Sequence, residues 1–428
     1  MAYIPIIILV LLMLTGIPVA FALMISTASY FLFINTGVPV DLIFQRMISG
    51  TESFPLLAIP FFITAGCVMN YGGLSSRLMK VADALTGHMR GGLAQVNVVL
   101  SLLMGGLSGS ANADAAMQCK ILVPEMSKRG YEPEFSAAIT SASSIITPIV
   151  PPGIGLILYA FLAEQSVAQL FFAGYVPGLL LMAALMVVVY FVAKKRNYAP
   201  IHEQRASTKT VFIQLGKSFW SLLLPLGILM GLRFGFFTPT EAGAMAVVYA
   251  VIVGAFIHRE LKPKHIPMIM LESVLSTSTI MLIILSASAF GYYLAWERLP
   301  QTISQILINI TENKYLFFLI INVFLLMVGM FLEGLASLII LTPLLVPAAT
   351  AIGIDPVHFG IVMVVNVSIG AITPPFGALA FLTSSILQLK VVKVFREMTW
   401  FTISMVLVLF ILSYFPAIVM FLPNLLGN

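Results

Sequence analysis

The sequence has few charged residues. Only 9% of its 428 residues are Asp, Glu, Lys or Arg, whereas 60% are hydrophobic, and the mean hydropathy is +1.05. Soluble domains carry roughly 25% charged residues, so this composition indicates a polytopic protein of the lipid bilayer. A spanning helix needs about 20 apolar residues, and the apolar stretches suffice for about ten spans. The net charge of +5 is carried largely by short loops and predicts no nucleic-acid partner.

The sequence also lacks the motifs of several enzyme classes. Its two cysteines, Cys67 and Cys119, have neither metal-binding nor redox spacing, and we interpret them as packing residues. No G-x-x-x-x-G-K-[S/T] loop is present, so we expect no ATP hydrolysis and no cofactor. Energy is therefore expected from an ion gradient. No basic region precedes the first apolar run, which predicts a first membrane segment and not a cleaved signal.

Two long apolar segments contain adjacent prolines. Pro151-Pro152 interrupts the segment at 133–167, and Pro374-Pro375 interrupts the segment at 356–388. Proline removes a backbone donor and clashes with the preceding helical turn, so neither segment can be one continuous helix. Non-helical backbone in a membrane is tolerated only where it is buried in protein or lines a cavity. Each broken helix is therefore a candidate binding site.

Two other stretches are interrupted by polar or glycine-containing sequences. Residues 91–127 form two apolar arms, too short for ordinary spans, around the sequence SGSANAD at 108–114. Residues 315–349 form a second pair of arms around the sequence GMFLEG at 329–334. We predict that both stretches are re-entrant helical hairpins.

The two halves of the chain share prolines and glycines at one constant spacing. Pro374-Pro375 follows Pro151-Pro152 by 223 residues. The same spacing relates Thr15 to Thr238, Val123 to Val346, Pro124 to Pro347, Gly130 to Gly353, and Pro133 to Pro356. Matched prolines and glycines are improbable by chance. We therefore predict an internal repeat, with its first half over 1–193 and its second half over 218–428.

Charge and the number of crossings predict that the halves are inverted. The polar loop at 194–217 is rich in Lys and Arg, which places it in the cytoplasm. A re-entrant hairpin does not cross the membrane, so the number of spans from Thr15 to Thr238 is odd, and an odd number inverts the second half relative to the first. Residues 3–34 form either two segments or one bent segment. Inverted repeats with paired broken helices are typical of secondary transporters, whose site lies at the midplane between the halves. The predicted fold class is thus an all-α polytopic membrane protein of the secondary-transporter type.

The first hairpin tip and the first break carry the clearest candidate site. Helix C-termini and unwound carbonyls coordinate cations, whereas helix N-termini attract carboxylates. This combination suits a sodium ion together with an anionic solute. The alternative is that the polar residues are helix caps and small packing residues. The predicted first sodium site comprises Ser108, Ser110, Asn112, Thr147 and Pro151, and Asp114 joins Ser110 and Asn112 as a predicted substrate contact.

The second half offers fewer polar groups. Glu333 lies in an apolar run, and an intramembrane carboxylate is costly enough to predict a function. It is expected to accept a substrate hydroxyl, support an ion site or pair with an arginine, the alternative being a capped hairpin turn. The predicted second sodium site comprises Gly329, Glu333, Gly370, Thr373 and Pro374.

Several of these motifs together resemble a known family. The sequence is similar to the large membrane subunit of tripartite ATP-independent periplasmic (TRAP) transporters, and within that family it most resembles the sialic-acid type. The motifs that carry the resemblance are SGS at 108–110, ILVPEM at 121–126, Gly130-Tyr131, Pro151-Pro152, FTPTEA at 237–242, GIDPVHFG at 353–360 and TPP at 373–375.

The resemblance implies a sodium-driven importer of an organic acid in a bacterial inner membrane. It implies two partners, a small four-helix membrane subunit and a soluble periplasmic binding protein, as well as an elevator motion of the hairpins and broken helices. Sialic acid is the expected solute, with C4-dicarboxylates or another carboxylate next. Many members have serine at Gly153, an expected substrate position, glycine at Gln118, and aspartate at Glu333. The pocket shape is therefore expected to differ here.

Other functions fit the sequence less well. A stand-alone sodium/dicarboxylate carrier needing no binding protein is the alternative within the transporter class. An intramembrane enzyme would need clustered carboxylates or histidines, which the sparse acidic residues do not supply. A membrane scaffold would not explain two double-proline breaks.

Overall fold

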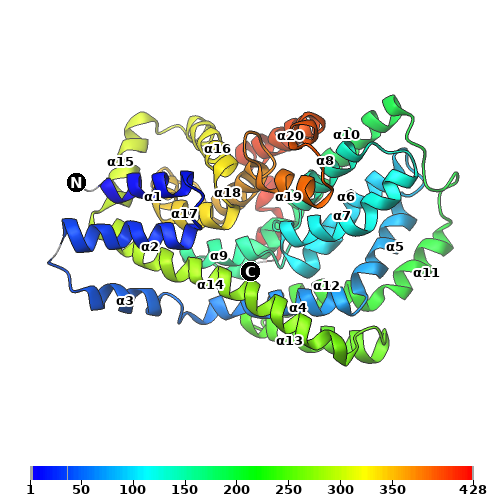
Figure 1. Ribbon diagram of the computed structural model, residues 1–428, viewed down its shortest axis with the longest axis horizontal. Helices are drawn as coiled ribbons and strands as arrows, with labels where there is room; N and C mark the ends of the chain where they lie inside the picture. Colours follow the sequence, from blue (N-terminus) through cyan, green and yellow to red (C-terminus); the bar gives the residue numbers. More distant parts are fainter. Residues whose placement is uncertain (1–2, 36, 427–428) are drawn as a thin grey trace.

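The computed structural model describes residues 3–35 and 37–426, and these fold into helices without any strand (Figure 1). Among them, seven helices are long and apolar enough to cross a membrane, or eight if a pair bent by 71° counts as one span. That pair is α11 (Thr208–Lys217) and α12 (Phe219–Arg233). Four further apolar helices have only 10–17 residues. The polytopic all-α fold is confirmed, whereas the figure of about ten spans stays a prediction.

Both predicted hairpins and both predicted breaks are present. The first hairpin consists of α6 (Gly92–Ser108) and α7 (Ala111–Lys128), and the second of α16 (Lys314–Phe331) and α17 (Gly334–Ala351). The broken helices are α8 (Pro133–Ser144) with α9 (Ile154–Leu162), and α18 (Pro356–Gly370) with α19 (Ala378–Ile386). Each double proline lies in the non-helical segment between its two half-helices, as the missing backbone donors require.

Helix bounds repeat at the spacing of 223 residues. Helices α7 and α17 begin at Ala111 and Gly334, and α8 and α18 begin at Pro133 and Pro356. Even two π-helical segments match, η1 (Tyr30–Ile34) and η3 (Val253–Ile257). The internal repeat therefore extends from sequence to structure.

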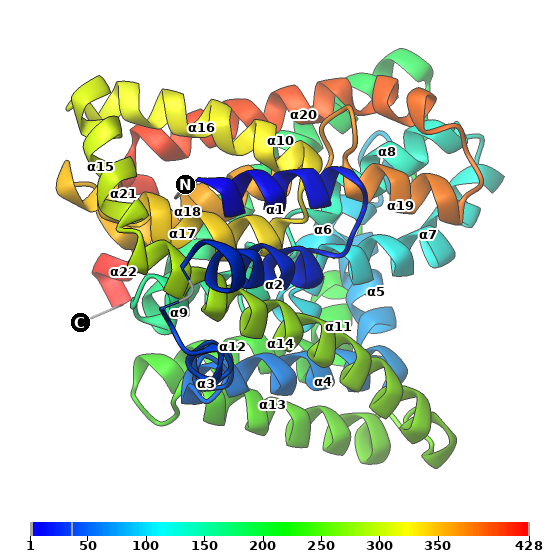
Figure 2. The same cartoon turned by 60° about the vertical axis from the view of Figure 1, so that its left-hand side comes forward.

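The remaining helices surround these elements. In Figures 1 and 2, α4 and α13 lie along one side of the molecule, and α16 and α20 along the opposite side. The remaining bounds are α1 (Ile4–Leu14), α2 (Val19–Ser29), α3 (Val40–Ser49), η2 (Phe54–Leu57), α4 (Ala58–Tyr71), α5 (Leu74–Thr86), α10 (Val167–Arg196), α13 (Pro239–Ile252), η4 (Pro263–His265), α14 (Ile266–Trp296), α15 (Leu299–Ile310), α20 (Val391–Tyr414), α21 (Pro416–Val419) and α22 (Phe421–Leu426).

One helix occurs where the sequence predicts a polar connection. Helix α11 lies within the expected loop at 194–217. Helix α11 begins at a local signal, because the Ser207 side chain accepts a hydrogen bond from the Thr210 backbone N–H at 3.1 Å. A polar sequence that can be capped thus still forms helix.

The two halves interlock through their broken helices. The Ser141 and Thr383 hydroxyls, from α8 and α19, lie 2.7 Å apart in the buried core. The Tyr159 hydroxyl of α9 donates to the Pro356 carbonyl at 2.6 Å. Gly360 makes room for the same tyrosine ring, because a Cβ there would lie 2.2 Å from Tyr159 Cε1. The half-helices of the two broken helices are consequently held against each other.

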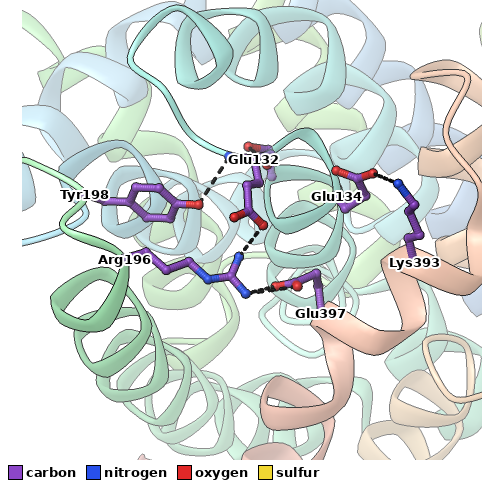
Figure 3. A network of polar contacts seen from close by, with 7 residues as sticks. Glu132, Glu134, Arg196, Tyr198, Lys393 and Glu397 are labelled. Carbon is purple, nitrogen blue, oxygen red and sulfur yellow. Dashed lines mark hydrogen bonds and ion pairs between the residues drawn. The ribbon is translucent and has the colours of Figure 1, made fainter.

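A network of ion pairs joins three helix ends (Figure 3). The Arg196 guanidinium, at the end of α10, contacts Glu132 at 2.8 Å and Glu397 of α20 at 2.7 Å. Lys393 of α20 contacts Glu134 of α8 at 3.2 Å. These contacts tie the first broken helix to α10 and α20, so that the three elements form one packed unit.

Candidate transport site

Both hairpin tips and both breaks meet at one cavity of about 540 Å³. Such a volume is typical of sites for small molecules. Side chains of α4 and α14 form the rest of its wall. The lining residues from the hairpins and breaks include Ser108 to Ala113, Ile145, Pro148, Ile154, Gly155, Glu333 to Leu335, Ser368, Ala371, Ala378 and Leu379.

Four helix N-termini converge on this cavity. First-turn residues of α7, α9, α17 and α19 all line it. A helix N-terminus has unpaired N–H groups and a partial positive charge of roughly half a unit. Such ends are ready-made sites for carboxylates. The cavity is therefore suited to an anion without any cationic side chain.

Helix C-termini reach the same cavity. Ser108 is the last residue of α6, and Ile145 and Ala371 are the C-caps of α8 and α18. Their orphan carbonyls carry the opposite partial charge and accept cations. One cavity thus offers groups for an anion and groups for a small cation.

Glu333 is the only Asp, Glu, Lys, Arg or His among the lining residues that the structure describes. It is the N-cap of α17, yet its side chain makes no capping hydrogen bond. Among the described residues its carboxylate has neither an ion-pair nor a hydrogen-bond partner, so of the three roles left open by the sequence the structure shows no arginine pairing. Its side chain does not cap the turn either, and it lines the cavity.

The first tip places three predicted residues at the cavity. Ser108, Ser110 and Asn112 all line it. Ser110 is also the N-cap of α7, with its hydroxyl 3.4 Å from the Ala113 backbone nitrogen, so capping and binding are not exclusive at this position. The tip is held by a close approach, because a Cβ at Gly109 would lie 2.5 Å from the Pro152 carbonyl oxygen.

Asp114 and Thr147 lie behind the tip and outside the cavity lining. Both side chains are fully buried. One carboxylate oxygen of Asp114 accepts hydrogen bonds from Ser101 at 2.7 Å, Gln118 at 2.8 Å and Thr147 at 3.2 Å. A carboxylate enclosed in this way has no access to a solute in the cavity. The prediction of a direct substrate contact by Asp114 is therefore corrected to a position in a buried polar cluster.

The other predicted residues of the breaks also lie outside the lining. Pro151 and Gly153 are buried, and a Cβ at Gly153 would lie 2.0 Å from the Pro148 carbonyl oxygen. Thr373 donates its hydroxyl to the Ile369 carbonyl at 2.8 Å, and Pro374 is exposed. These residues shape the breaks, while the cavity wall is made by their neighbours.

Gly329 and Gly370 form a close contact between α16 and α18. A Cβ at Gly370 would lie 2.5 Å from Gly329 Cα, and one at Gly329 would lie 3.0 Å from Gly370 Cα. Neither glycine lines the cavity. In the structure their shared role is to let the second hairpin approach the second break.

Known proteins match this chain over nearly its whole length. Residues 6–418 match the family described as "Tripartite ATP-independent periplasmic transporter, DctM component". The chain belongs to the DctM family. It is a multi-pass protein of the inner membrane.

Named relatives of this DctM-family chain differ in solute. It is 38% identical over 414 residues to the sialic acid TRAP transporter large permease protein SiaM of Vibrio cholerae, covering 97% of this chain and 96% of the relative. It is 39% identical to the C4-dicarboxylate large permease protein DctM of Pseudomonas aeruginosa, with 89% of each chain covered. The YdaH transporter of Alcanivorax borkumensis shares the fold, with a TM-score of 0.64 at 14% identity over 96% of this chain and 98% of that one.

Sequence reasoning missed part of the DctM-family cavity. Asn70 on α4 and Ser276 and Thr279 on α14 face it, and so does Cys67, which we had interpreted as a packing residue. These side chains sit singly in apolar spans, beside no break and no tip. A single polar residue in an apolar span gives no local signal that it faces a cavity.

Proposed function

We propose that this chain is the membrane subunit of a sodium-coupled importer of an organic acid. The convergence of four helix N-termini and several C-termini on one cavity carries the proposal. An anionic solute would lie against the N–H groups of the tips and half-helices. A sodium ion would take the carbonyls and hydroxyls of the first tip, with Ser108, Ser110 and Asn112 as ligands. Each charge would reduce the unfavourable desolvation of the other.

The chemistry of the cavity favours a hydroxylated acid. Glu333 supplies acceptor oxygens but no donor, so it would bind a hydroxyl and repel a second carboxylate. We infer that a sugar acid such as sialic acid fits this cavity better than a C4-dicarboxylate. Replacing Glu333 by Gln should weaken binding of the sugar acid about tenfold or more, and should leave dicarboxylate binding unchanged or strengthen it, because the repulsion of the second carboxylate is removed. Glu312→Gln, at an exposed acidic residue outside the cavity, is the matched control.

The partners follow from the tripartite family. The chain would work with a small four-helix membrane subunit and with a periplasmic binding protein that delivers the solute. The two hairpins and the two broken helices would move together against α4, α13 and α14 in an elevator motion.

Reconstitution tests the sodium coupling. The chain, together with both partners in proteoliposomes, should take up sialic acid only when a sodium gradient is imposed. Uptake that survives collapse of the gradient would disprove the coupling. Omitting the binding protein distinguishes the tripartite importer from a stand-alone dicarboxylate carrier, because only the stand-alone carrier would transport without it.

The first sodium site has its own test. Ser110→Ala and Asn112→Ala should raise the sodium concentration needed for half-maximal uptake while leaving the amount of inserted protein unchanged. Ser207→Ala, at the N-cap of α11 and outside the cavity, is a control that removes a comparable cap. Unchanged sodium dependence in both tip variants would refute the assignment.

A further inference from the structure

A second cavity, of about 590 Å³, lies between α5, the end of α11, the start of α12 and the loop after η3. In Figure 1, α5 and α11 lie toward the right-hand end of the molecule, and α12 lies nearer its middle. Arg77 and Lys80 come from α5 and Lys217 from α11, and all three line the cavity. These basic residues are far apart in sequence, and the tertiary structure gathers them in one place.

The charges of this cavity are not balanced internally. Arg77 contacts Glu260 at 2.7 Å, and that glutamate is the only acidic lining residue described. Among the described residues, Lys80 and Lys217 form no ion pair, and both are exposed. Burial, followed by the nearby Arg77, lowers the pKa of His258, so this imidazole adds no charge at neutral pH. Two cations are therefore available to a ligand.

Exposed aromatic residues lie beside the cavity in the chain: Trp220 lines it, Phe219 precedes Trp220, and Phe256 precedes the lining residue Ile257. Phe219 is 51% exposed and Trp220 39% exposed at the start of α12, and Phe256 is 73% exposed just before the loop that carries His258. Tryptophan in such a position is typical of the boundary between membrane and water. Helix α12 is bent by 71° from α11 at this point.

From this geometry we propose that the cavity binds the phosphate head group of an anionic phospholipid. The two free lysines would contact the phosphate, and the acyl chains would lie along the exposed aromatic residues of α12 and η3. Basic pockets between membrane helices on the cytoplasmic side are suited to such head groups. A free anion would use the lysines but not the exposed aromatic residues beside them, which is why a lipid fits better than inorganic phosphate.

The chain permits a site-specific measurement. It has three tryptophans, and only Trp220 lines this cavity. In a Trp296→Phe/Trp400→Phe background, phosphatidylglycerol with brominated acyl chains should quench Trp220 at a lower mole fraction than equally brominated phosphatidylcholine. Each lysine near an anionic surface contributes about a fivefold preference, so Lys80→Gln/Lys217→Gln should reduce the preference by roughly 30-fold.

Two controls make the outcome decisive. Lys194→Gln/Lys195→Gln removes two exposed lysines outside the cavity and should leave the preference intact. Inorganic phosphate should displace the brominated phosphatidylglycerol only weakly. Equal quenching by the two lipids, a preference that survives loss of Lys80 and Lys217, or full displacement by millimolar phosphate would each overturn the proposal.

Discussion

Replacing Gly370 by Ala tests whether the contact between α16 and α18 fixes the second hairpin. The new Cβ would lie 2.5 Å from Gly329 Cα and 2.6 Å from the Gly329 carbonyl carbon, both of which are backbone atoms. Ordinary contacts begin near 3.4 Å, so the two helices must separate by about 1 Å. Forcing extra atoms into a packed core costs about 1–3 kcal/mol.

The matched control is Gly291→Ala on α14. No heavy atom would lie within 4 Å of a Cβ at that position. Alanine is favoured over glycine inside a helix by roughly 0.5–1 kcal/mol, so this variant should be as stable as the parent or more stable. The two substitutions add the same methyl group and differ only in their surroundings. Both glycines lie in helices, so the preference for alanine is common to the two variants, and their free energies of unfolding should differ by about 1–3 kcal/mol.

Thermal unfolding of both variants in the same detergent measures this difference. G370A should melt below the parent protein and G291A at or above it. G370A should also transport more slowly, because the tip at 332–333 would move relative to the second break. Equal melting temperatures for the two variants would refute the reasoning, since they would show that α16 and α18 can separate without loss of stability.

Two further predictions concern reactivity and ion pairing. A charged methanethiosulfonate should label Cys67, which lines the cavity, and should not label Cys119, which is 1% exposed. Bound solute should slow the labelling of Cys67. Equal labelling rates with and without solute would place Cys67 outside the site. Arg196→Gln should lower the melting temperature, because it leaves Glu132 and Glu397 without their shared partner. Lys128→Gln, which removes a single exposed pair, should change the melting temperature little, and equal shifts in both variants would contradict the role of the network.

The helix breaks were predictable because their cause is local. Adjacent prolines cannot continue a helix whatever surrounds them, and both double prolines lie between half-helices in the structure. The first tip was predictable for a similar reason, since a serine- and asparagine-rich sequence between apolar arms favours caps over helix interior. Ser108, Ser110, Asn112 and Glu333 accordingly line the cavity.

Which face of each helix lines the cavity was not predictable from the sequence. Asp114 and Ser110 are four residues apart, yet Ser110 lines the cavity and Asp114 is enclosed by Ser101, Gln118 and Thr147. Which side of α7 meets the solute depends on the packing of α6 and α8 against it. A single polar residue in a span, such as Thr279, gives no sequence signal of its own, because its neighbours come from distant parts of the chain.

The sequence by itself determined the membrane class, the repeat and the positions of the tips and breaks. These follow from transfer free energies and backbone restrictions that act on each residue and its immediate neighbours. Only the tertiary structure decided that both tips and both breaks share one cavity with α4 and α14, and that Gly329 and Gly370 serve a close helix contact. Those features depend on which helix faces meet across more than a hundred residues of chain, and packing of the whole molecule sets them.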